Sequence, residues 1–405
     1  MFKTNIQNLL VVGIDTVSIA KSARETGYRI YAVDYFGDID LRRVCSVCKA
    51  IIEQKRGKSC GRAESKFKPE VFLKMTKSLL EKHEIDAILL SSGLDDFFDV
   101  LYGLNDLVPI LGNSPEVIER VRKKQGFFKE LGCLGIVHPE TAIVKDADEA
   151  KAAAVEIGYP VVVKPVKGFG GAGIRTAQNS EETGRAFLEA SLASEDVLIQ
   201  NFIDGIHASI SFLVADNDVR VLTINEQLLG LRFLFQQEPF GYCGNIVPLH
   251  FANSILAICE RITKKIALHF GLKGSNGIDL VISKEGTPYV MEVNPRFQGT
   301  LECVEKVLRI NLVKSHIDAC LHSSLPTIRE KTSTFCTRLI LRAPKRIVAP
   351  DLTIFREVRD VPLPGTIIEK GEPLCSIITE GKNRKFSFQK GKKLAEAIYG
   401  MLHPA

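Results

Sequence analysis

The sequence has no tryptophan, only four methionines and no long run of apolar residues. Its longest apolar stretches have the length of a β-strand, whereas a membrane-spanning helix needs about 20 consecutive apolar residues, so we expect no membrane segment. Neither sign of charge is in large excess, because the net charge is only +5 over 405 residues. Without a basic patch interleaved with aromatic residues, we expect no nucleic-acid partner. The slight positive excess suits anionic substrates such as nucleotides.

The N-terminal segment lacks the pattern of a secretory signal, which is a basic region, a long apolar segment and a small-residue cleavage site. We therefore expect a cytoplasmic protein whose ten cysteines form no disulfide framework. Most cysteines, such as Cys133 and Cys320, stand among apolar residues and are predicted to be buried. Cys45, Cys48 and Cys60 lie close in sequence but lack a nearby fourth ligand. An irregular loop is the preferred interpretation there, with metal binding left open.

The beginning of the chain has the order of a parallel α/β domain but lacks the glycines of a dinucleotide site. Residues 9–14 predict a buried strand, residues 18–27 a helix and residues 28–38 a second strand. Asp34 stands where a ribose-binding acid would, yet the first turn has only Gly13 in place of GxGxxG. A pyrophosphate could not approach the helix closely enough, which argues against NAD.

The rest of the chain alternates helical and strand patterns without repeats, and its length is sufficient for two to four domains. Ser114 and Pro115 mark the start of a helix that we expect to run to about Gly132, with Lys124 near its middle. Taken alone, Lys124 would be a solvent-exposed helix lysine. Residues 138–215 predict an α+β unit with the character of a lid, and the last seventy residues are rich in short strands and turns.

The segment VVVKPVKGFGGAGI, residues 161–174, combines a strand with a glycine-rich loop. Lys164 interrupts a β-branched run just before a proline, which is a poor position for an ordinary buried strand residue. Glycine beside lysine after a strand suggests a flexible loop that closes over phosphates, but no GxxxxGK[ST] motif is present. The loop glycines are Gly168, Gly170, Gly171 and Gly173.

A second pair of strands, GIDLVIS and TPYVMEVN, is predicted to form a hairpin through the turn SKEG. This hairpin sets Asp279 roughly opposite Glu292, and Asn294 points to the same face as Glu292 because it is two residues further on. Three oxygen donors on one surface suit Mg²⁺, which takes few protein ligands and completes its shell with phosphates and water. Arg296 follows, placed to grip a phosphoryl oxygen. A polar hairpin edge is the competing interpretation.

These motifs occur in an order that resembles the ATP-grasp superfamily over nearly the whole chain: a helix lysine, a strand lysine with a glycine loop, the strand LIQNFIDG, and Asp…Glu-x-Asn-Pro-Arg. The resemblance is to biotin-carboxylase-like members, and most of all to the archaeal predicted ATP-dependent carboligases, through VDYFGDIDLR, GYCGNIVPL and VPLPGTIIEKGEPLCSI. It implies an ATP-grasp fold of mixed α/β and α+β class. A Rossmann-like pre-ATP-grasp domain would cover 1–114, an ATP-grasp domain 115–320 with a mobile lid at about 138–215, and a β-rich C-terminal region 321–405.

The resemblance also implies roles for individual residues. Gln200 stands where the family often has a glutamate at the adenine edge, and His207 where many members carry an acid near the ribose. The remaining implied roles are phosphate contacts by Lys124 and Lys164, a flap over the γ-phosphate from Gly168, Gly170, Gly171 and Gly173, adenine contacts by backbone groups of Asn201 and Ile203, Mg²⁺ (or Mn²⁺) ligation by Asp279, Glu292 and Asn294, and acyl-phosphate stabilisation by Arg296.

The implied activity is that of a carbon–nitrogen ligase, which uses ATP to convert a small-molecule carboxylate into an acyl phosphate and couples it to an amine. A bicarbonate-using carboxylase is one alternative, but Gln298 is followed by Gly299 and Thr300, and the next acid, Glu302, would face differently. A non-catalytic nucleotide-binding protein is the other. Tyr242, Asn245 and His250 either line the acceptor pocket or form a structural loop. A homodimer is compatible with the sequence.

Overall fold

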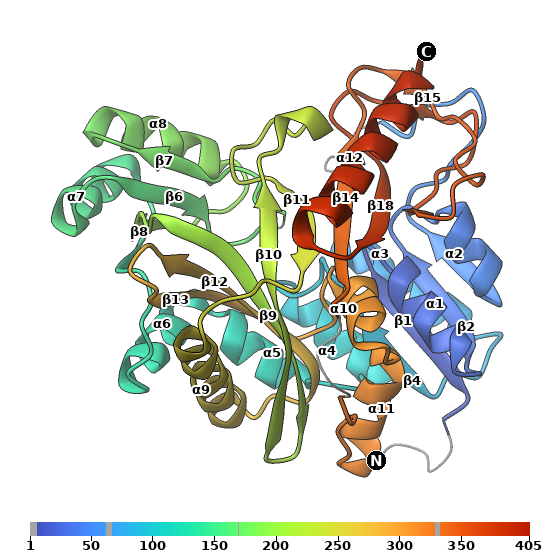
Figure 1. Cartoon of the computed structure of the whole chain (residues 1–405), viewed down its shortest axis with the longest axis horizontal. Helices are drawn as coiled ribbons and strands as arrows, with labels where there is room; N and C mark the ends of the chain where they lie inside the picture. The colour runs from blue at the N-terminus through green and yellow to red at the C-terminus, as the bar shows by residue number, and fades with distance from the viewer. Residues whose placement is uncertain (1–5, 62–66, 169, 329–332) are drawn as a thin grey trace.

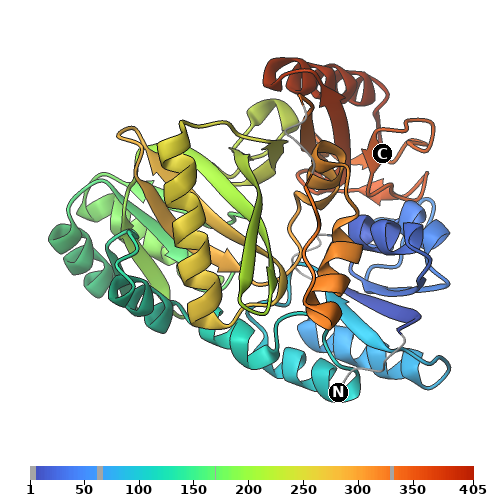
Figure 2. The ribbon, with the colours of Figure 1, turned by 60° about the horizontal axis from the view of Figure 1, so that its bottom comes forward.

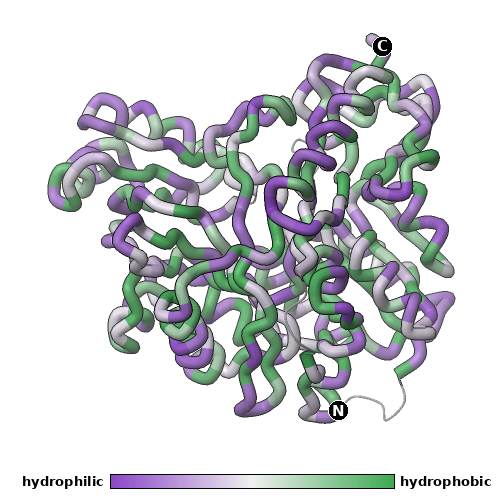
Figure 3. Tube along the Cα trace, viewed as in Figure 1, coloured by the Kyte–Doolittle hydropathy of each residue, from purple (hydrophilic) through white to green (hydrophobic). Residues whose placement is uncertain are grey.

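The computed structural model describes residues 6–61, 67–168, 170–328 and 333–405. The chain forms a small parallel sheet, an antiparallel sheet with two helices, and a long antiparallel sheet between them and the C-terminal segment (Figure 1). This mixed α/β arrangement with a β-rich C-terminal part confirms the predicted fold class. Apolar segments run mainly through the interior strands, whereas helix α12 (Arg384–Gly400) is largely polar on the surface (Figure 3).

The N-terminal part is a four-stranded parallel sheet in the order β3-β2-β1-β4. Asp34 ends β2, and its carboxylate accepts hydrogen bonds from Thr16 and from the backbone N–H groups of Phe36 and Gly37. The residue therefore closes its own turn, in agreement with the absence of a dinucleotide motif. The elements of this part are β1 (Asn8–Gly13), α1 (Val17–Glu25), β2 (Arg29–Asp34), α2 (Ile39–Val44), β3 (Val47–Ala50), α3 (Pro69–Leu80), β4 (Ala87–Leu90) and α4 (Phe98–Leu107).

The single helix predicted from Ser114 to about Gly132 is wrong: two helices occupy this segment. They are α5 (Pro115–Arg122) and α6 (Lys124–Cys133), separated by Lys123 with φ −67° and ψ 95°. Because Lys123 has an extended backbone, Lys124 begins a new helix and points inward, with only 4% of its surface exposed. Cys133, predicted to be buried, is exposed at the end of α6, and all ten cysteines are free thiols.

The second part is an antiparallel sheet in the order β5-β8-β6-β7, covered by two helices. Its elements are β5 (Thr141–Val144), α7 (Ala147–Ile157), β6 (Val161–Pro165), β7 (Arg175–Ala177), α8 (Ser180–Ser191) and β8 (Val197–Asn201). Residues 205–215, which the expected lid included, form a strand of the long sheet instead. We therefore propose that the lid ends near Asn201 and lies inside an ATP-grasp domain that we still expect at residues 115–320.

The long sheet has the order β13-β12-β9-β10-β11-β14-β18-β16 and joins residues 205–294 to the C-terminal region. Helix α9 lies across one of its faces (Figure 2). Its strands are β9 (Gly205–Ala215), β10 (Asp218–Leu229), β11 (Tyr242–Val247), β12 (Gly274–Ser283), β13 (Pro288–Asn294), β14 (Phe335–Arg342), β16 (Val358–Arg359) and β18 (Pro373–Gly381). Around it lie η2 (Arg232–Leu234), α9 (Asn253–Phe270), α10 (Leu301–Leu308), α11 (Leu312–His322) and a small sheet of β15 (Ile347–Val348), β17 (Ile367–Ile368) and β19 (His403–Pro404).

His316 on α11 ties the N-terminal part to the long sheet. Its Nδ1 accepts the N–H of Ser275 at 2.8 Å and its Nε2 lies 2.9 Å from the Leu111 carbonyl, so the neutral ring satisfies both groups. Burial lowers the pKa of His316 to about 4 from its ordinary 6.5, although the contact with Leu111 raises it. No described helix is long and apolar enough to cross a membrane.

We predict that His316 makes the protein acid-sensitive. Between pH 6.5 and 4 the unfolded chain binds a proton at this residue more readily than the folded one. The free energy of unfolding therefore decreases as the pH is lowered through that window. His316→Gln should remove up to about 3 kcal/mol of this acid-induced loss. Urea unfolding at pH 7.5, 6, 5 and 4 measures it, with the exposed His322→Gln as control. An unchanged pH dependence in His316→Gln would contradict the prediction.

Candidate active site

One large cleft, with a volume of about 860 Å³, lies where the three parts of the fold meet. With the exception of Gly173, every residue to which the resemblance assigns a role lines this cleft. Tyr242 and Asn245 line it as well, on strand β11 rather than on a loop, whereas His250 does not. Residues that are more than 170 positions apart in sequence therefore converge on one cavity.

The hairpin of β12 and β13 has the register that the sequence predicted, with Asp279 paired directly to Glu292. Asp279 Oδ2 accepts a hydrogen bond from Asn294 Nδ2 at 3.0 Å, and its Oδ1 accepts one from Gln227 Nε2 at 2.9 Å. Burial, and then the nearby charge of Glu292, raise the pKa of Asp279 to about 7. The two carboxylates and the amide of Asn294 thus form one cluster of oxygen donors at the edge of the long sheet. We call Asp279, Glu292 and Asn294 the oxygen cluster.

Glu292 contacts two cationic side chains of the cleft. Its Oε2 lies 2.8 Å from Lys124 Nζ, and its Oε1 lies 3.2 Å from Arg122 Nη1. Burial raises the pKa of Glu292, but the positive charges of Arg122, Lys124 and Lys164 outweigh that effect and hold the pKa well below its usual range. Glu292 therefore carries a full negative charge inside the protein.

Lys164 points into the same cluster from β6. Its ammonium has no ion-pair partner among the described residues, and burial followed by the charge of Lys124 lowers its pKa to about 8. Lys164 is half-buried, and a positive charge there without a fixed counter-ion is costly unless an anion binds beside it. This feature agrees with the sequence argument that a lysine in this strand is unusual.

The sequence analysis missed the residues that hold the cluster in place. Arg122 binds Asp96 through two hydrogen bonds of 2.8 and 2.9 Å, and Arg296 Nε lies 2.9 Å from both oxygens of Asp95. Both aspartates belong to the polar loop after β4, so the N-terminal part fixes two arginines of the cleft. The doublet of aspartates directly after a buried strand was the available signal.

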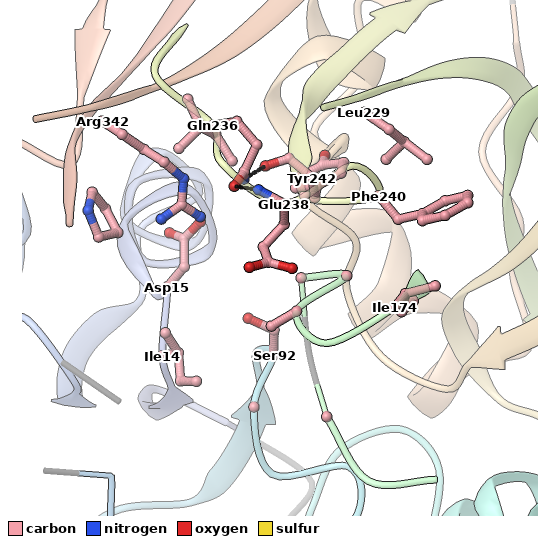
Figure 4. Close-up of a pocket in the computed structure, with 18 of the residues that line it drawn as sticks. Ile14, Asp15, Ser92, Ile174, Leu229, Gln236, Glu238, Phe240, Tyr242 and Arg342 are labelled. Atoms are coloured by element: carbon pink, nitrogen blue, oxygen red, sulfur yellow. Dashed lines mark hydrogen bonds between the residues drawn. The ribbon is translucent and has the colours of Figure 1, made fainter. Parts of the chain in front are cut away.

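The glycine loop packs against the segment that joins β10 to β11. The carbonyl of Gly170 accepts the N–H of Tyr242 at 2.9 Å. Gly171 has φ +79°, and a Cβ on it would lie 2.0 Å from the Phe240 carbonyl oxygen, so only glycine fits. Glu238 from the same segment points toward this loop in Figure 4 and pairs with Arg175 of β7. Phe169 lies outside the described residues.

The residues expected at the base and ribose form the other end of the cleft. Gln200 is 2% exposed and donates to Thr141 Oγ1 at 2.7 Å. The N–H of Asn201 donates to the Glu140 carbonyl. Ile203 lines the cleft, and its N–H has no backbone acceptor among the described residues. His207 stacks edge-on to Phe240, and burial lowers its pKa, so the ring is neutral.

Metal ligands other than the oxygen cluster are not apparent in the described part of the chain, where no three His, Cys, Asp or Glu side chains converge. Cys45 and Cys48 lie at the end of α2 and in β3, and burial raises the pKa of both thiols. No third His, Cys, Asp or Glu among the described residues completes a metal site with them. The oxygen donors of Asp279, Glu292 and Asn294 remain the set that fits a hard cation.

Comparisons with known proteins agree with this geometry. Residues 121–300 match the family model of the ATP-grasp domain. The chain is 25% identical over 383 residues to an uncharacterized protein of Methanocaldococcus jannaschii, covering 92% of this chain and 88% of that protein. It is 27% identical over 215 residues to the carbamoyl phosphate synthase large chain of Deinococcus deserti, covering 51% of this chain and only 20% of that protein.

The fold of the whole chain is that of a biotin carboxylase. The structure of the biotin carboxylase from Campylobacter jejuni, a complex with β-γ-ATP, superposes with a TM-score of 0.73 at 17% identity, covering 98% of this chain and 92% of that one. Residues 121–300 therefore are an ATP-grasp domain, and the chain as a whole has the ATP-grasp fold.

We predict that Arg122 is essential to the stability of the cleft. Arg122→Met leaves the largely buried Asp96 without its counter-ion and leaves Glu292 with Lys124 alone, which should lower the free energy of unfolding by about 3–5 kcal/mol. Arg185→Met is the matched control, because Arg185 lies 3.9 Å from Glu181 on an exposed helix face. It should change stability by less than about 1 kcal/mol. Equal urea midpoints for the two variants would contradict this assignment.

Proposed function

We propose that the protein is an ATP-dependent carboxylate–amine ligase that forms an acyl phosphate and releases ADP and phosphate. One observation carries this proposal: two lysines, two carboxylates, an amide and an arginine line a single cleft of an ATP-grasp domain. Lys124 and Lys164 bring positive charge to the place where a triphosphate would need it. The ATP complex of the structurally similar biotin carboxylase supports ATP as the nucleotide.

The donor set fits Mg²⁺ or Mn²⁺. Asp279, Glu292 and Asn294 would hold the ion, which when bound would neutralise phosphate charge. Both oxygens of Glu292 contact cationic side chains in this structure, so its negative charge would be shared between Arg122, Lys124 and the ion. The ammonium of Lys124, which lies beside these oxygen donors, would contact a phosphate.

The glycine loop and the base-proximal residues complete the proposed nucleotide site. Gly168, Gly170, Gly171 and Gly173 would form the flap over the γ-phosphate, and its contact with Tyr242 supports a closed position. Gln200, Asn201, Ile203 and His207 would surround the base and ribose. A closed flap excludes water, which would otherwise hydrolyse the acyl phosphate.

In the proposed reaction a substrate carboxylate oxygen attacks the γ-phosphorus and ADP leaves with the electron pair of the broken P–O bond. The amine nitrogen then attacks the carbonyl carbon, the carbon–oxygen bond to phosphate breaks, and the nitrogen loses a proton. Arg296, held rigidly by Asp95, would stabilise the negative charge that develops on the acyl phosphate.

The position of Glu302 counts against a bicarbonate-using carboxylase. Glu302 lies in the first turn of α10 and pairs with Arg359 and Lys21, and it does not line the cleft. A carboxylate fixed in this way cannot act as a base on bicarbonate in the cleft. A non-catalytic nucleotide-binding protein would have little use for the oxygen cluster beside Lys164, so the ligase is preferred. The alignment with a carbamoyl phosphate synthase supports ATP-dependent ligation more generally.

A screen of carboxylates with Mg-ATP and hydroxylamine tests the proposed function. Hydroxylamine traps an acyl phosphate, so we expect a hydroxamate together with stoichiometric ADP for at least one carboxylate. Release of AMP would overturn the acyl-phosphate route. ADP release that depends on bicarbonate and on no other carboxylate would favour the carboxylase instead.

We predict that Glu292→Gln reduces ATP turnover by at least about a thousandfold, because the neutral amide holds a metal ion poorly and no longer balances the buried cations. Glu285→Gln, in the exposed turn of the same hairpin, should retain wild-type turnover. Circular dichroism verifies that both variants are folded. If the first variant does not fold, Asp279→Asn replaces it. Near wild-type turnover in a folded variant of either ligand would refute the metal assignment.

A further inference from the structure

The cleft continues beyond the oxygen cluster into a second lobe that the proposed nucleotide site does not use. This lobe lies between the carboxyl ends of β1 and β2 and the strands β14 to β18 of the C-terminal region. Asp15 follows β1, Arg338 lies on β14 and Asp360 follows β16, and all three line the lobe. Figure 4 shows Asp15 beside the guanidinium of Arg342 at this end of the pocket.

Two carboxylates share one arginine here. Arg338 Nη2 lies 2.7 Å from Asp15 Oδ2 and 3.0 Å from Asp360 Oδ2, and its Nη1 donates to the Gly299 carbonyl at 3.0 Å. Nη2 also lies 3.1 Å from Ser376 Oγ. Only 5% of the Arg338 side chain is exposed. We call Asp15, Arg338 and Asp360 the triad. With both carboxyls ionised, these three side chains together carry one net negative charge.

The triad leaves polar atoms without protein partners. Oδ1 of Asp15, Oδ1 of Asp360 and Nε of Arg338 are buried and have no hydrogen-bond partner among the described residues. Thr366 Oγ1, on the same lobe, is in the same condition. Unsatisfied buried polar atoms cost about 1–3 kcal/mol each, so several around one cavity indicate a ligand with complementary groups.

The backbone of Asp360 supports the same conclusion. Its φ is +57°, a left-handed conformation that is uncommon for residues other than glycine, and Asp40 holds it there by accepting the N–H of Asp360 at 3.0 Å. Such conformations persist where the surrounding structure enforces them, often at binding sites. The carboxylate of Asp360 is thus aimed at the lobe rather than placed by local preference.

The triad adjoins the region where the proposed acyl phosphate would form. Gly299, which accepts from Arg338, is three residues after Arg296, and the Gln298 side chain donates to the carbonyls of Asn294 and Arg296. The segment 294–299 therefore links the oxygen cluster to the triad directly. A molecule in the second lobe would lie beside the segment that follows Arg296.

We propose that Asp15 and Asp360, held on either side of Arg338, bind the amine substrate as an ammonium ion, with an apolar part of that amine against Ile52, Pro362 and Ile367. This proposal rests on the ligase function above. An ammonium has three donors and no acceptor, which matches two carboxylate oxygens that lack donors. A purely anionic substrate group has no hydrogen to donate, so it would leave these two oxygens unsatisfied.

The same carboxylates supply a destination for the proton that the amine must lose. An ammonium has no free electron pair, so one N–H proton passes to a carboxylate before the nitrogen attacks the carbonyl carbon. The leaving phosphate departs with the electron pair of the broken carbon–oxygen bond and takes up the second N–H proton, so that a neutral amide remains. Burial, and then the charge of Asp15, raise the pKa of Asp360 to about 7, so this carboxyl can accept and release a proton near neutral pH.

A binding experiment tests the subsite without depending on turnover. Wild-type protein is titrated with a panel of amino acids and linear diamines, each paired with its N-acetylated form, in the presence of Mg-ADP. We expect at least one free amine to bind at least tenfold more tightly than its acetylated form, and Asp15→Asn and Asp360→Asn to reduce that affinity by about tenfold or more. Asp218→Asn, an exposed aspartate at the far end of β10, is the matched control.

The catalytic readout is the ratio of the amine-dependent rate to the hydroxylamine-dependent rate with the same carboxylate. The ratio should fall in Asp15→Asn and Asp360→Asn and stay constant in Asp218→Asn, because hydroxylamine is neutral and needs no ammonium subsite. Equal binding of free and acetylated amines, or no binding of any amine, would overturn the subsite. Hydroxamate formation with an unchanged ratio would overturn the subsite and leave the ligase function standing. Thr366→Val serves as a second variant if both aspartate variants unfold.

Discussion

The ionised carboxylate of Glu292 is the interaction on which the cleft depends. Arg122 and Lys124 hold its two oxygens at 3.2 and 2.8 Å, and Lys164 adds a third positive charge from another sheet. Charges in a medium of low dielectric constant must be balanced locally. The charged side chains around Glu292 come from α5, α6, β6 and β13. Each of these elements must therefore hold its charged side chain in a fixed position.

The same requirement explains how the N-terminal part is attached. It offers no residue to the nucleotide end of the cleft among those we propose, yet Asp95 and Asp96 fix Arg296 and Arg122 through paired hydrogen bonds. Asp15 does the same for Arg338. These contacts run from the loops after β1 and β4 to helix α5, to the segment after β13 and to strand β14. The N-terminal part thus acts as the rigid support that orients the arginines, which is the condition for electrostatic stabilisation.

Local patterns predicted some of these features and missed others for physical reasons. The two-residue period of a strand was sufficient to place Asp279 opposite Glu292, because a hairpin leaves one register open once its turn is fixed. The helix after Ser114 was predicted as one element because helix propensity does not register a single extended residue such as Lys123. The apolar neighbours of Cys133 suggested burial, but a helix end leaves that side chain exposed.

The ion pairs of the second lobe were beyond sequence reasoning. Asp15 and Arg338 are 323 residues apart, and neither stands in a motif that would mark it. A charged residue in a loop or on a strand is most often solvated, so nothing local distinguishes Asp15 from other acids. Only tertiary structure shows that the arginine is buried between two carboxylates. Long-range charge pairing of this kind is specified by the fold and not by neighbours in the chain.

The proposed flap and the second lobe both lie next to strand β11. The backbone N–H of Tyr242 donates to the Gly170 carbonyl of the proposed flap, and the Tyr242 hydroxyl donates to Asn245 Oδ1. Its strand, β11, pairs with β14, which places Asn245 opposite Arg338. The proposed flap therefore contacts the strand that borders Arg338. Closure over the nucleotide and enclosure of the acceptor lobe would then occur together, which would keep water away from the acyl phosphate while the amine is in place.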